Sequence, residues 1–417
     1  MMRILICGAS GFIGQALCER LALGGYDVLR GVRRCSRITD VQIDFSHPLA
    51  PEMWAERLRG IDVVVNAVGI ITENTSSRFA DVHYRSPAAL FAGCVLAGVK
   101  RVVQISALGA EQGTTPYFRS KYAADQCVMK LPIEWCILCP SLVYGQNGTS
   151  AAMFRMSASL PLMLVPDLGD ARFQPIHVDD LVDAIVASIT QVTARGKCID
   201  VVGASRISYR EMLDSYRRQM GFPEAWHATI LAPVMAIAAR FAGMIPGAVL
   251  NTDNWKMLQA GNTGDIGGYT RLVGHVPRGI DDFIAPQCAE VARSRALVLW
   301  RIPLLRYVMA FVWIASAYVS ACVYPLQASL ELLAPLGLSG APAQVALFGA
   351  SVLDLIMGVA CVAYPQKGVW LIQAGLVIAY SLLIAVFEPA FLAHPFGPVL
   401  KNLPILALLL ILYTEES

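Results

Sequence analysis

The chain has 417 residues, of which 56% are hydrophobic and 15% charged, and its formal net charge is +2. A length of this order suggests two or three domains, and a mean hydropathy of +0.53 is too high for a wholly water-soluble protein. The near-zero net charge, without a basic stripe, argues against a nucleic-acid partner.

The first 140 residues alternate between short apolar runs and segments with helical spacing. The predicted strands are Arg3–Cys7, Asp27–Val32, Asp62–Val68, Arg101–Ser106 and Glu134–Cys139, and the predicted helices are Phe12–Leu23, Ser86–Ala97 and Tyr117–Lys130. Continuous β-branched runs indicate strands that are buried on both faces. Strands that alternate with helices through right-handed crossovers predict a doubly wound parallel α/β sheet of the Rossmann type.

The strand Arg3–Cys7 leads into Gly8-Ala9-Ser10-Gly11-Phe12-Ile13-Gly14, which opens a helix. This is the context that a dinucleotide-binding fingerprint requires. Gly8 permits the tight turn, Gly11 lets the backbone approach a pyrophosphate at the helix N-terminus, and Gly14 permits close packing of helix and strand. We expect cofactor contacts from Gly8, Ser10, Gly11, Phe12, Ile13 and Gly14.

The end of the second predicted strand bears on the choice of cofactor. An NAD-binding unit places Asp or Glu there for the ribose 2′-hydroxyl. This chain instead has Arg33 and Arg34, and guanidinium groups suit a 2′-phosphate. The sequence therefore favours NADP(H) over NAD(H), with a solvated basic turn as the alternative interpretation.

Tyr117 and Lys121 are four residues apart and project from one face of a predicted helix. A nearby cation lowers the pKa of a phenol, so we expect Tyr117 to exchange protons with a carbonyl or alcohol substrate. Ser106, at the end of the preceding strand, is placed to bind the same oxygen. Cys136 and Cys139 form a C-x-x-C pattern, but on a strand they face opposite sides, so we expect no metal site there.

The motifs of the first ~290 residues resemble, in order, those of the extended and atypical short-chain dehydrogenase/reductase superfamily. Besides the glycine motif these are Asn66–Gly69, Ile105–Ala110, Tyr117 with Lys121, Pro140–Gly145 and Phe173–Asp180. The similarity extends to the atypical branch that includes a complex I accessory subunit. It implies that Asp44 approaches the adenine, that Ala67, Val68 and Gly69 line the cofactor, and that Pro140 and Val143 lie by the nicotinamide. It also implies a catalytic trio of Tyr117, Lys121 and Ser106, with Lys121 contacting the cofactor as well.

From about residue 146 to residue 292 the pattern is looser, because Gly and Pro interrupt it often. Ile176–Ile189 and Ser208–Met220 are predicted helices, the second of which begins with a capping box. The segment Ala228–Leu250 is strongly apolar but broken by two prolines and an arginine. We expect it either to lie at a membrane surface as an amphipathic helix or to pack within the domain.

Only five charged residues lie between Tyr307 and Tyr413. The four apolar runs of this stretch are Arg306–Tyr324, Ala343–Tyr364, Val369–Phe387 and Phe396–Tyr413. Each approaches the ~20 residues needed to cross a bilayer. Arginines precede the first run, and the loop between the first two runs has no Lys or Arg. The positive-inside rule then predicts a multi-pass inner-membrane protein whose soluble part lies in the cytoplasm.

Ionisable residues inside a bilayer are costly and are candidates for function. Asp354 falls near the middle of the second apolar run. We expect it to serve function or helix pairing, with a hydrated residue that faces the bundle interior as the alternative. Glu388 and Lys401 lie near the outer ends of the third and fourth runs and are placed to pair, unless Lys401 reaches the interface alone.

The last ~110 residues resemble the DoxX-like four-helix membrane family, most clearly at Phe396–Pro404. The predicted parts are a Rossmann domain over 1–145, a small α/β substrate-side part over 146–292 and an all-α four-helix transmembrane domain over 305–414. The resemblances imply a membrane-anchored NADP(H)-dependent oxidoreductase or epimerase for a lipophilic substrate such as a quinone, an isoprenoid or a lipid-linked sugar. The alternative is a non-catalytic NAD(P)H-binding structural or assembly protein of a membrane complex.

Overall fold

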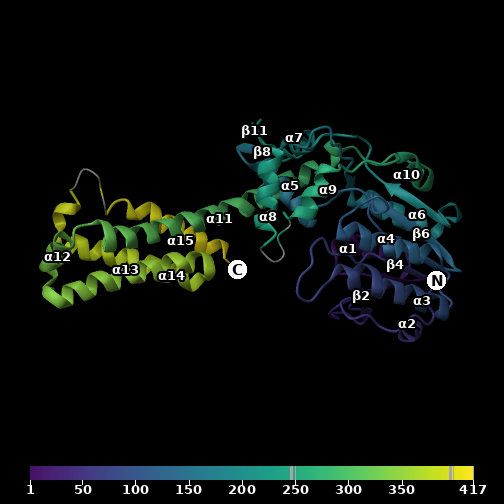
Figure 1. Ribbon diagram of the computed structural model, residues 1–417, viewed down its shortest axis with the longest axis horizontal. Helices are drawn as coiled ribbons and strands as arrows, with labels where there is room; N and C mark the ends of the chain where they lie inside the picture. Colours follow the sequence, from purple (N-terminus) through teal and green to yellow (C-terminus); the bar gives the residue numbers. More distant parts are fainter. Residues whose placement is uncertain (245–247, 249, 394–396, 398, 417) are drawn as a thin grey trace. The chain divides into compact units, whose positions relative to one another are not determined.

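The computed structural model describes residues 1–244, 248, 250–393, 397 and 399–416 (Figure 1). The chain divides into two compact units, Met1–Ala296 and Leu297–Ser417. The first unit contains the predicted Rossmann and substrate-side parts, and the second contains the apolar C-terminal helices.

A seven-stranded sheet forms the centre of the first unit. Its strands are β1 (Arg3–Cys7), β2 (Asp27–Val32), β3 (Asp40–Gln42), β4 (Val63–Asn66), β5 (Arg101–Ile105), β6 (Glu134–Pro140) and β10 (Lys197–Val201). They pair in the order β10-β6-β5-β4-β1-β2-β3, and every pair is parallel. The predicted doubly wound parallel sheet is therefore confirmed. The strand order reverses between β1 and β4, and ligands bind to such sheets at the carboxyl ends of the strands that flank this point.

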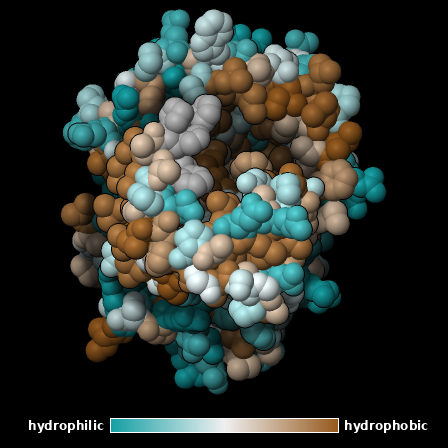
Figure 2. Space-filling view, turned by 90° about the vertical axis from the view of Figure 1, so that its left-hand side faces the viewer, coloured by the Kyte–Doolittle hydropathy of each residue, from teal (hydrophilic) through white to brown (hydrophobic). Residues whose placement is uncertain are grey.

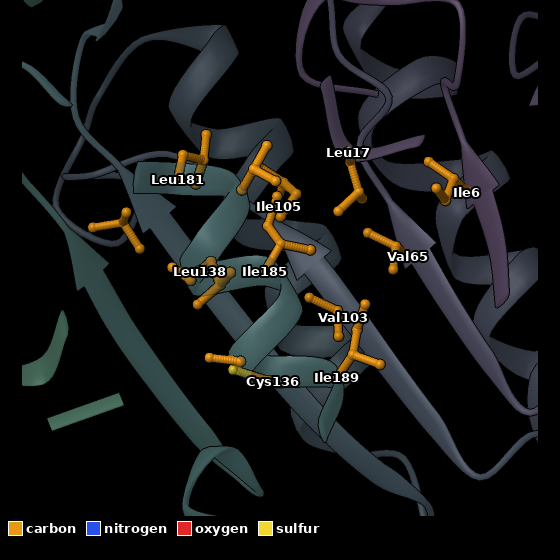
Figure 3. Packing of buried hydrophobic residues seen from close by; sticks show 14 of the residues in the cluster. Ile6, Leu17, Val65, Val103, Ile105, Cys136, Leu138, Leu181, Ile185 and Ile189 are labelled. Atoms are coloured by element: carbon orange, nitrogen blue, oxygen red, sulfur yellow. The ribbon is translucent and has the colours of Figure 1, made fainter. Parts of the chain in front are cut away.

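Helices cover both faces of the sheet because neighbouring strand residues point to opposite sides. The helices are α1 (Phe12–Leu23), α2 (Pro51–Arg57), α3 (Ser86–Ala97), α4 (Pro116–Met129), α6 (Val178–Thr190) and α10 (Ile266–Val273). On β1, Ile4 and Ile6 pack toward α1, α6 and α10, whereas Leu5 and Cys7 pack toward α2, α3 and α4. Figure 3 shows the first of these two cores, with side chains of α6 lying over β5 and β6.

The substrate-side part adds two short parallel strand pairs and four helices. These are β7 (Val143–Tyr144) with β9 (Ile176–His177), β8 (Leu162–Pro166) with β11 (Trp226–Ile230), and α5 (Thr149–Ser159), α7 (Tyr209–Gln219), α8 (Ala232–Ala242) and α9 (Thr252–Gln259). The predicted capping box at Ser208 and Glu211 is present. The segment Ala228–Leu250 forms the end of β11 and then α8, and part of its C-terminal end lies outside the described residues.

The second unit is helical, with α11 (Ala289–Tyr318) leading into it, followed by α12 (Leu326–Leu333), α13 (Gly340–Ala363), α14 (Lys367–Phe387) and α15 (Asn402–Glu415). In the described part of the chain, three helical segments are long and apolar enough to cross a membrane: Pro286–Val323, Gly340–Ala363 and Lys367–Phe387. The predicted fourth run, Phe396–Tyr413, begins at residues that are not described and continues as α15. With 14 residues, α15 is about 21 Å long, which is short of the ~30 Å hydrocarbon core. Four spanning helices were predicted, and the structure supports three candidate spans.

The second unit carries its large apolar side chains on the outside. Phe311, Val345 and Val386 are each about seven-tenths exposed, and hydrophobic residues cover much of the face seen in Figure 2. Its interior is a small hydrophobic cluster that includes Trp313 and Trp370, and polar groups lie among these residues. Gln373 is fully buried, and its Oε1 accepts a hydrogen bond from Trp313 Nε1 at 2.8 Å. A surface of this kind suits contact with lipid.

Polar pairs also join the helices of this unit. Tyr380 of α14 is a neighbour of Asp354 of α13, so the predicted intramembrane acid lies beside a polar side chain of the next helix. Arg306 forms an ion pair with Glu416 at 2.7 Å, which connects α11 to the end of α15. Among the described ion pairs, the one expected between Glu388 and Lys401 does not occur.

We expect Gly358→Ala to destabilise this unit. Gly358 lies on α13, and an added Cβ would lie 2.6 Å from Cγ1 of Ile314 and 3.1 Å from the carbonyl oxygen of Ala310, both on α11. Overpacking costs roughly 1–3 kcal/mol, so the apparent Tm of the detergent-solubilised chain should fall by roughly 2–8 °C. The control is Gly349→Ala on the same helix, where a Cβ meets nothing within 4 Å. Equal shifts for the two variants would contradict this contact between α11 and α13.

Candidate cofactor and substrate site

The glycine motif forms a tight turn between β1 and α1. Gly8 has a φ of +84°, and its N–H donates to the carbonyl of Gly31 on β2 at 3.0 Å. A Cβ on Gly14 would lie 2.1 Å from the carbonyl oxygen of Gly8, so no side chain fits there. Helix α1 begins after Gly11 without a side-chain cap. Its first N–H groups therefore remain available to an anion, as a bound pyrophosphate requires.

The residues predicted to line the cofactor gather around this turn. Ala67 follows β4, and its carbonyl oxygen would lie 3.0 Å from a Cβ on Gly8. The N–H of Val68 donates to the Asn66 side chain at 3.3 Å. Gly145 lies close to the ring of Phe12, since a Cβ there would be 2.6 Å from a ring carbon. The structure thus brings both segments to the edge of the sheet that holds the glycine motif.

Pro140 and Val143 occupy the neighbouring strand ends. Pro140 closes β6, and its carbonyl accepts the N–H of Leu108 at 2.9 Å. Val143 begins β7 and is paired with Ile176 of β9. Both predicted residues therefore lie where β6 passes into the substrate-side part. Whether they contact a nicotinamide stays a prediction.

Arg33 and Arg34 follow the end of β2, and both are exposed. Neither forms an ion pair or a side-chain hydrogen bond within the described part of the chain. Their guanidinium groups are therefore free to receive a charged ligand at the carboxyl edge of the sheet.

Two carboxylates lie beyond β2. Asp44, which was predicted to approach the adenine, accepts the N–H of Ser46 at 2.9 Å. Asp40, which was not predicted, accepts the N–H of Ser36 at 2.7 Å and pairs with Arg30 at 3.0 Å. The bond from Ser36 is the main cause that lowers the pKa of Asp40. These two interactions of Asp40 therefore help to fix the conformation of the loop that contains Arg33 and Arg34.

Lys121 extends from α4 to the carboxyl ends of β4 and β5. Its Nζ donates to the carbonyl of Ile105 at 3.1 Å and to that of Val68 at 3.3 Å. A Cβ on Gly69 would lie 3.2 Å from this nitrogen. Burial lowers the pKa of Lys121 to about 8, against the opposing effect of Asp125. The ammonium is therefore charged at neutral pH, and its third N–H is available to a ligand.

Tyr117 lies one turn before Lys121 and is half-buried. Its ring packs edge-on against His83 and Phe79, with centroid distances of 5.4 and 5.9 Å. Burial, with a smaller effect of Asp125, raises the pKa of Tyr117 to about 12. The pKa of Tyr117 is thus raised and not lowered as expected from the nearby cation, because burial is the largest effect. The phenol stays protonated at neutral pH and is suited to donate a proton.

Ser106, which was expected to bind the same oxygen as Tyr117, forms its hydrogen bond with Asp125. Its hydroxyl donates a short hydrogen bond to Oδ2 of Asp125, and both side chains are buried. Burial raises the pKa of Asp125 to about 6. Within the described residues, no hydrogen bond links Ser106 to Tyr117. The structure thus brings Tyr117 and Lys121 together but turns Ser106 toward Asp125.

Sequence reasoning missed His83, which supports Tyr117 from the π-helix Ala80–Arg85. Its Nε2 accepts the N–H of Ile70 at 3.0 Å, and its Nδ1 lies 2.9 Å from Oγ of Ser120, which donates to the carbonyl of Tyr117. Burial lowers the pKa of His83 to about 2, so the ring is neutral. A lone histidine gives no sequence signal, whereas Asp125 continues the spacing from Tyr117 to Lys121 by four more residues and was detectable.

A cavity of about 250 Å³ lies beside Tyr117. Its lining consists of Ile71, Thr72, Glu73, Phe79, Tyr117, Gly243, Ala248, Asn251, Asp253 and Asn254. One wall is the loop that follows β4, and the other includes Gly243, Ala248, Asn251 and the first turn of α9. The cavity therefore lies between the Rossmann and substrate-side parts, where a substrate would reach the phenol.

Two family models match separate parts of the chain. Residues 4–202 match the NAD dependent epimerase/dehydratase family, and residues 310–410 match the DoxX-like family. The solved structure of a nucleoside-diphosphate-sugar epimerase from Staphylococcus aureus covers 68% of this chain and 99% of its own length, with 17% identity and a TM-score of 0.55. MoeE5 in complex with UDP-glucuronic acid and NAD covers 70% of this chain and 99% of its own length, with 19% identity and a TM-score of 0.53. At such identities these likenesses concern the fold alone.

Curated relatives match about half of the chain. The mitochondrial NADH dehydrogenase [ubiquinone] 1 alpha subcomplex subunit 9 of Arabidopsis thaliana is 28% identical over 228 residues, which is 50% of this chain and 56% of that protein. The ceramide reductase of Caulobacter vibrioides is 26% identical over 191 residues, which is 44% of this chain and 60% of that protein. The chain thus spans little more than half the length of these relatives.

We expect nucleotide affinity to fall as the pH rises through about 8, because Lys121 then loses the charge that orients its free N–H toward a ligand. A charge-assisted hydrogen bond contributes roughly 1.5–3 kcal/mol, so the Kd for NADPH should rise about tenfold or more between pH 7 and 9. The stability of the fold should instead increase over the same pH range. Since the folded pKa lies below the unfolded value of 10.5, the unfolded chain binds more protons in this window and the free energy of unfolding rises with pH.

The test is fluorescence titration of the full chain with NADPH at several pH values. Lys121→Met should show weak binding without this pH dependence. Lys100→Met is the control, because Lys100 is exposed and pairs with Asp62 at the opposite edge of the sheet. A pH profile in Lys121→Met that matches the wild type would refute the assignment.

Proposed function

We propose that this chain, which joins an NAD-dependent epimerase/dehydratase-type domain (residues 4–202) to a DoxX-like membrane domain (residues 310–410), is a membrane-anchored NADP(H)-dependent oxidoreductase for a lipophilic substrate. The observation that carries the proposal is that Tyr117, whose phenol is protonated at neutral pH, lines a cavity and lies one helical turn before Lys121, whose Nζ bonds to the loop that follows β4. Three candidate membrane spans in the same chain favour a substrate that resides in lipid.

In this proposal the residues of the chain bind and orient the cofactor and protonate the substrate. The N–H groups at the start of α1 hold the pyrophosphate, and Lys121 directs its third N–H to a hydroxyl of the cofactor ribose. The reduced nicotinamide, when bound, supplies the hydride. Tyr117 donates its proton to the carbonyl oxygen of the substrate, so that a ketone or aldehyde becomes an alcohol. Because an alkoxide is more basic than a phenolate, this transfer is favourable, and Tyr117 then regains a proton from solvent.

The substrate class is inferred from the anchor and from a relative. A ceramide reductase is 26% identical to part of this chain, which supports a carbonyl-bearing lipid as the substrate. Quinones, isoprenoids and lipid-linked sugars share a polar reacting group on an apolar body. The apolar body is inferred from the membrane anchor. The cavity suits the polar group, because five of its ten lining residues are Thr72, Glu73, Asn251, Asp253 and Asn254.

The preference for NADP(H) is supported by the two free guanidinium groups after β2. Arg33 and Arg34 lie where an NAD-binding unit offers a carboxylate to the 2′-hydroxyl. Arg30 is not available in the same way, because it pairs with Asp40.

We also propose that the protein resides in the inner membrane with its first unit in the cytoplasm. Arg293, Arg295 and Arg301 precede or begin the first apolar span, whereas the connection from α11 to α13 carries no Lys or Arg. Such an asymmetry favours a cytoplasmic location for the arginine-rich side.

The second candidate is a non-catalytic nucleotide-binding subunit of a membrane complex. The similarity to a protein named as a subunit of NADH dehydrogenase favours it, as does the engagement of Ser106 by Asp125. This role predicts tight nucleotide binding that does not respond to loss of the Tyr117 hydroxyl.

We expect Tyr117→Phe to separate the two candidates. The detergent-solubilised chain should oxidise NADPH when it is offered ceramide-precursor ketones, quinones and prenyl aldehydes, and Tyr117→Phe should lower kcat by roughly 10²–10⁴-fold because the proton donor is lost. The Kd for NADPH should not change. Tyr122→Phe, on the same helix, is the control and should retain activity. Wild-type protein that binds NADPH but reduces no carbonyl would support the non-catalytic role.

We expect the variant Arg33→Ala with Arg34→Ala to lose its preference for NADP(H). Removal of charge-assisted bonds to a 2′-phosphate, each of roughly 1.5–3 kcal/mol, should raise the Kd for NADPH by ten- to a hundredfold and leave that for NADH within twofold. Arg59→Ala, an exposed arginine before β4 at the opposite edge of the sheet, is the control. Parallel losses for both nucleotides would contradict a role in recognition of the 2′-phosphate.

A further inference from the structure

Helix α8 has one of the most exposed apolar faces in the first unit. Its packed side is a narrow stripe of Ala232, Met235, Ala239 and Ala242, of which only Ala239 is fully buried. Three of these four residues are alanine, so α8 rests on the domain through small side chains. The large apolar residues of the segment point the other way.

The exposed face consists of Leu231, Val234, Ile237, Phe241 and Met244, which are between 53% and 76% exposed. Their spacing of three or four residues places them on one side of the helix. A face that exposes five large apolar side chains in succession is costly in water and marks an interaction surface.

The charges around this face match a lipid headgroup layer. Between Leu231 and Met244 the sole charged residue is Arg240, which is exposed and borders the apolar face. Carboxylates are absent from this segment of the sequence. An apolar face with a basic flank is typical of helices that lie in the interface of a membrane with anionic lipids.

A second apolar surface belongs to the strand that leads into α8. Trp226 on β11 is 82% exposed, and its register partner Leu162 on β8 is 48% exposed, as is Leu164. Tryptophan is favoured at the boundary between headgroups and acyl chains. The strand pair thus carries the same kind of surface as α8.

The occupant of this surface follows from the rest of the chain. The candidate span Pro286–Val323 comes after α8 in the same polypeptide, so the first unit cannot diffuse away from the bilayer that holds the second. A tether of this kind raises the effective concentration of lipid at any apolar surface of the first unit.

We propose that α8 lies in the headgroup region of the bilayer with Leu231, Val234, Ile237 and Phe241 among the acyl chains, and that it admits lipid to the cavity at Tyr117. The admission of lipid to the cavity rests on the proposed function, whereas the contact of α8 with the bilayer does not. The helix ends at Ala242, and the next residue, Gly243, lines the same cavity as Tyr117. A lipid that follows α8 to its C-terminal end therefore arrives at this cavity.

Photo-crosslinking in nanodiscs of phosphatidylcholine and phosphatidylglycerol tests the membrane contact. Benzoylphenylalanine replaces Phe241 in the full chain, and in a second protein it replaces Val192. The two positions are 66% and 65% exposed, so they differ in location rather than in accessibility. We expect phospholipid adducts by mass spectrometry at position 241 and at least tenfold fewer at position 192. Equal yields at both positions, or adducts at 241 only with protein, would overturn the proposal.

A kinetic measurement tests the route for lipid. The variant Ile237→Ser with Phe241→Ser should raise the KM for a nanodisc-embedded carbonyl lipid by about tenfold, while kcat on a water-soluble short-chain analogue and the Kd for NADPH stay unchanged. Equal effects on both substrates would refute the route. If no carbonyl is reduced at all, the proposed function fails, and the crosslinking result still decides whether α8 contacts lipid.

Discussion

No side chain fits between the start of α1 and the turn that follows β1. The carbonyl oxygen of Gly8 occupies the place where a Cβ of Gly14 would lie, at 2.1 Å. This contact fixes how closely α1 approaches the sheet, and it directs the first N–H groups of α1 at the crevice between β1 and β4. The loop after β4, the Lys121 ammonium and the segment from Pro140 to Gly145 are arranged around that crevice. The position of the candidate site therefore depends on this close contact between the backbones of Gly8 and Gly14.

Features encoded by neighbouring residues were predictable. The glycine turn, the spacing of Tyr117 and Lys121, and the alternation of strand and helix are all local patterns, and the structure contains them. The partners of the site residues were not predictable, because they come from distant segments. Ser106 at the end of β5 bonds to Asp125 of α4, and the ring of His83, from the π-helix Ala80–Arg85, packs against Tyr117. The altered pKa of Tyr117 depends on burial, which no single segment reveals.

The membrane unit shows a similar division. Its lack of charge and its long apolar runs were evident from the sequence, and three of the four runs form helices long enough to cross a membrane. The fourth was overestimated, because hydrophobic composition does not mark where a helix begins, and α15 starts at Asn402. The contacts in the interior of this unit could not be predicted from the sequence. Gln373 looks like any polar residue in the sequence, yet it is buried and joins Trp313 of α11 to α14.

The order of elements in the sheet has a consequence for biogenesis. One face of the sheet is covered by α1, α6 and α10, and the last two helices are encoded after β1, β2, β4, β5 and β6. The end of α10 lies ~130 residues after the end of β6, so at roughly 5–20 residues per second a ribosome needs about 7–27 s to complete this stretch. During that interval α1 is the helix that covers this face, and the apolar residues of β5 and β6 wait for α6. The core of the first unit is therefore completed only shortly before the first candidate span, Pro286–Val323, is synthesised.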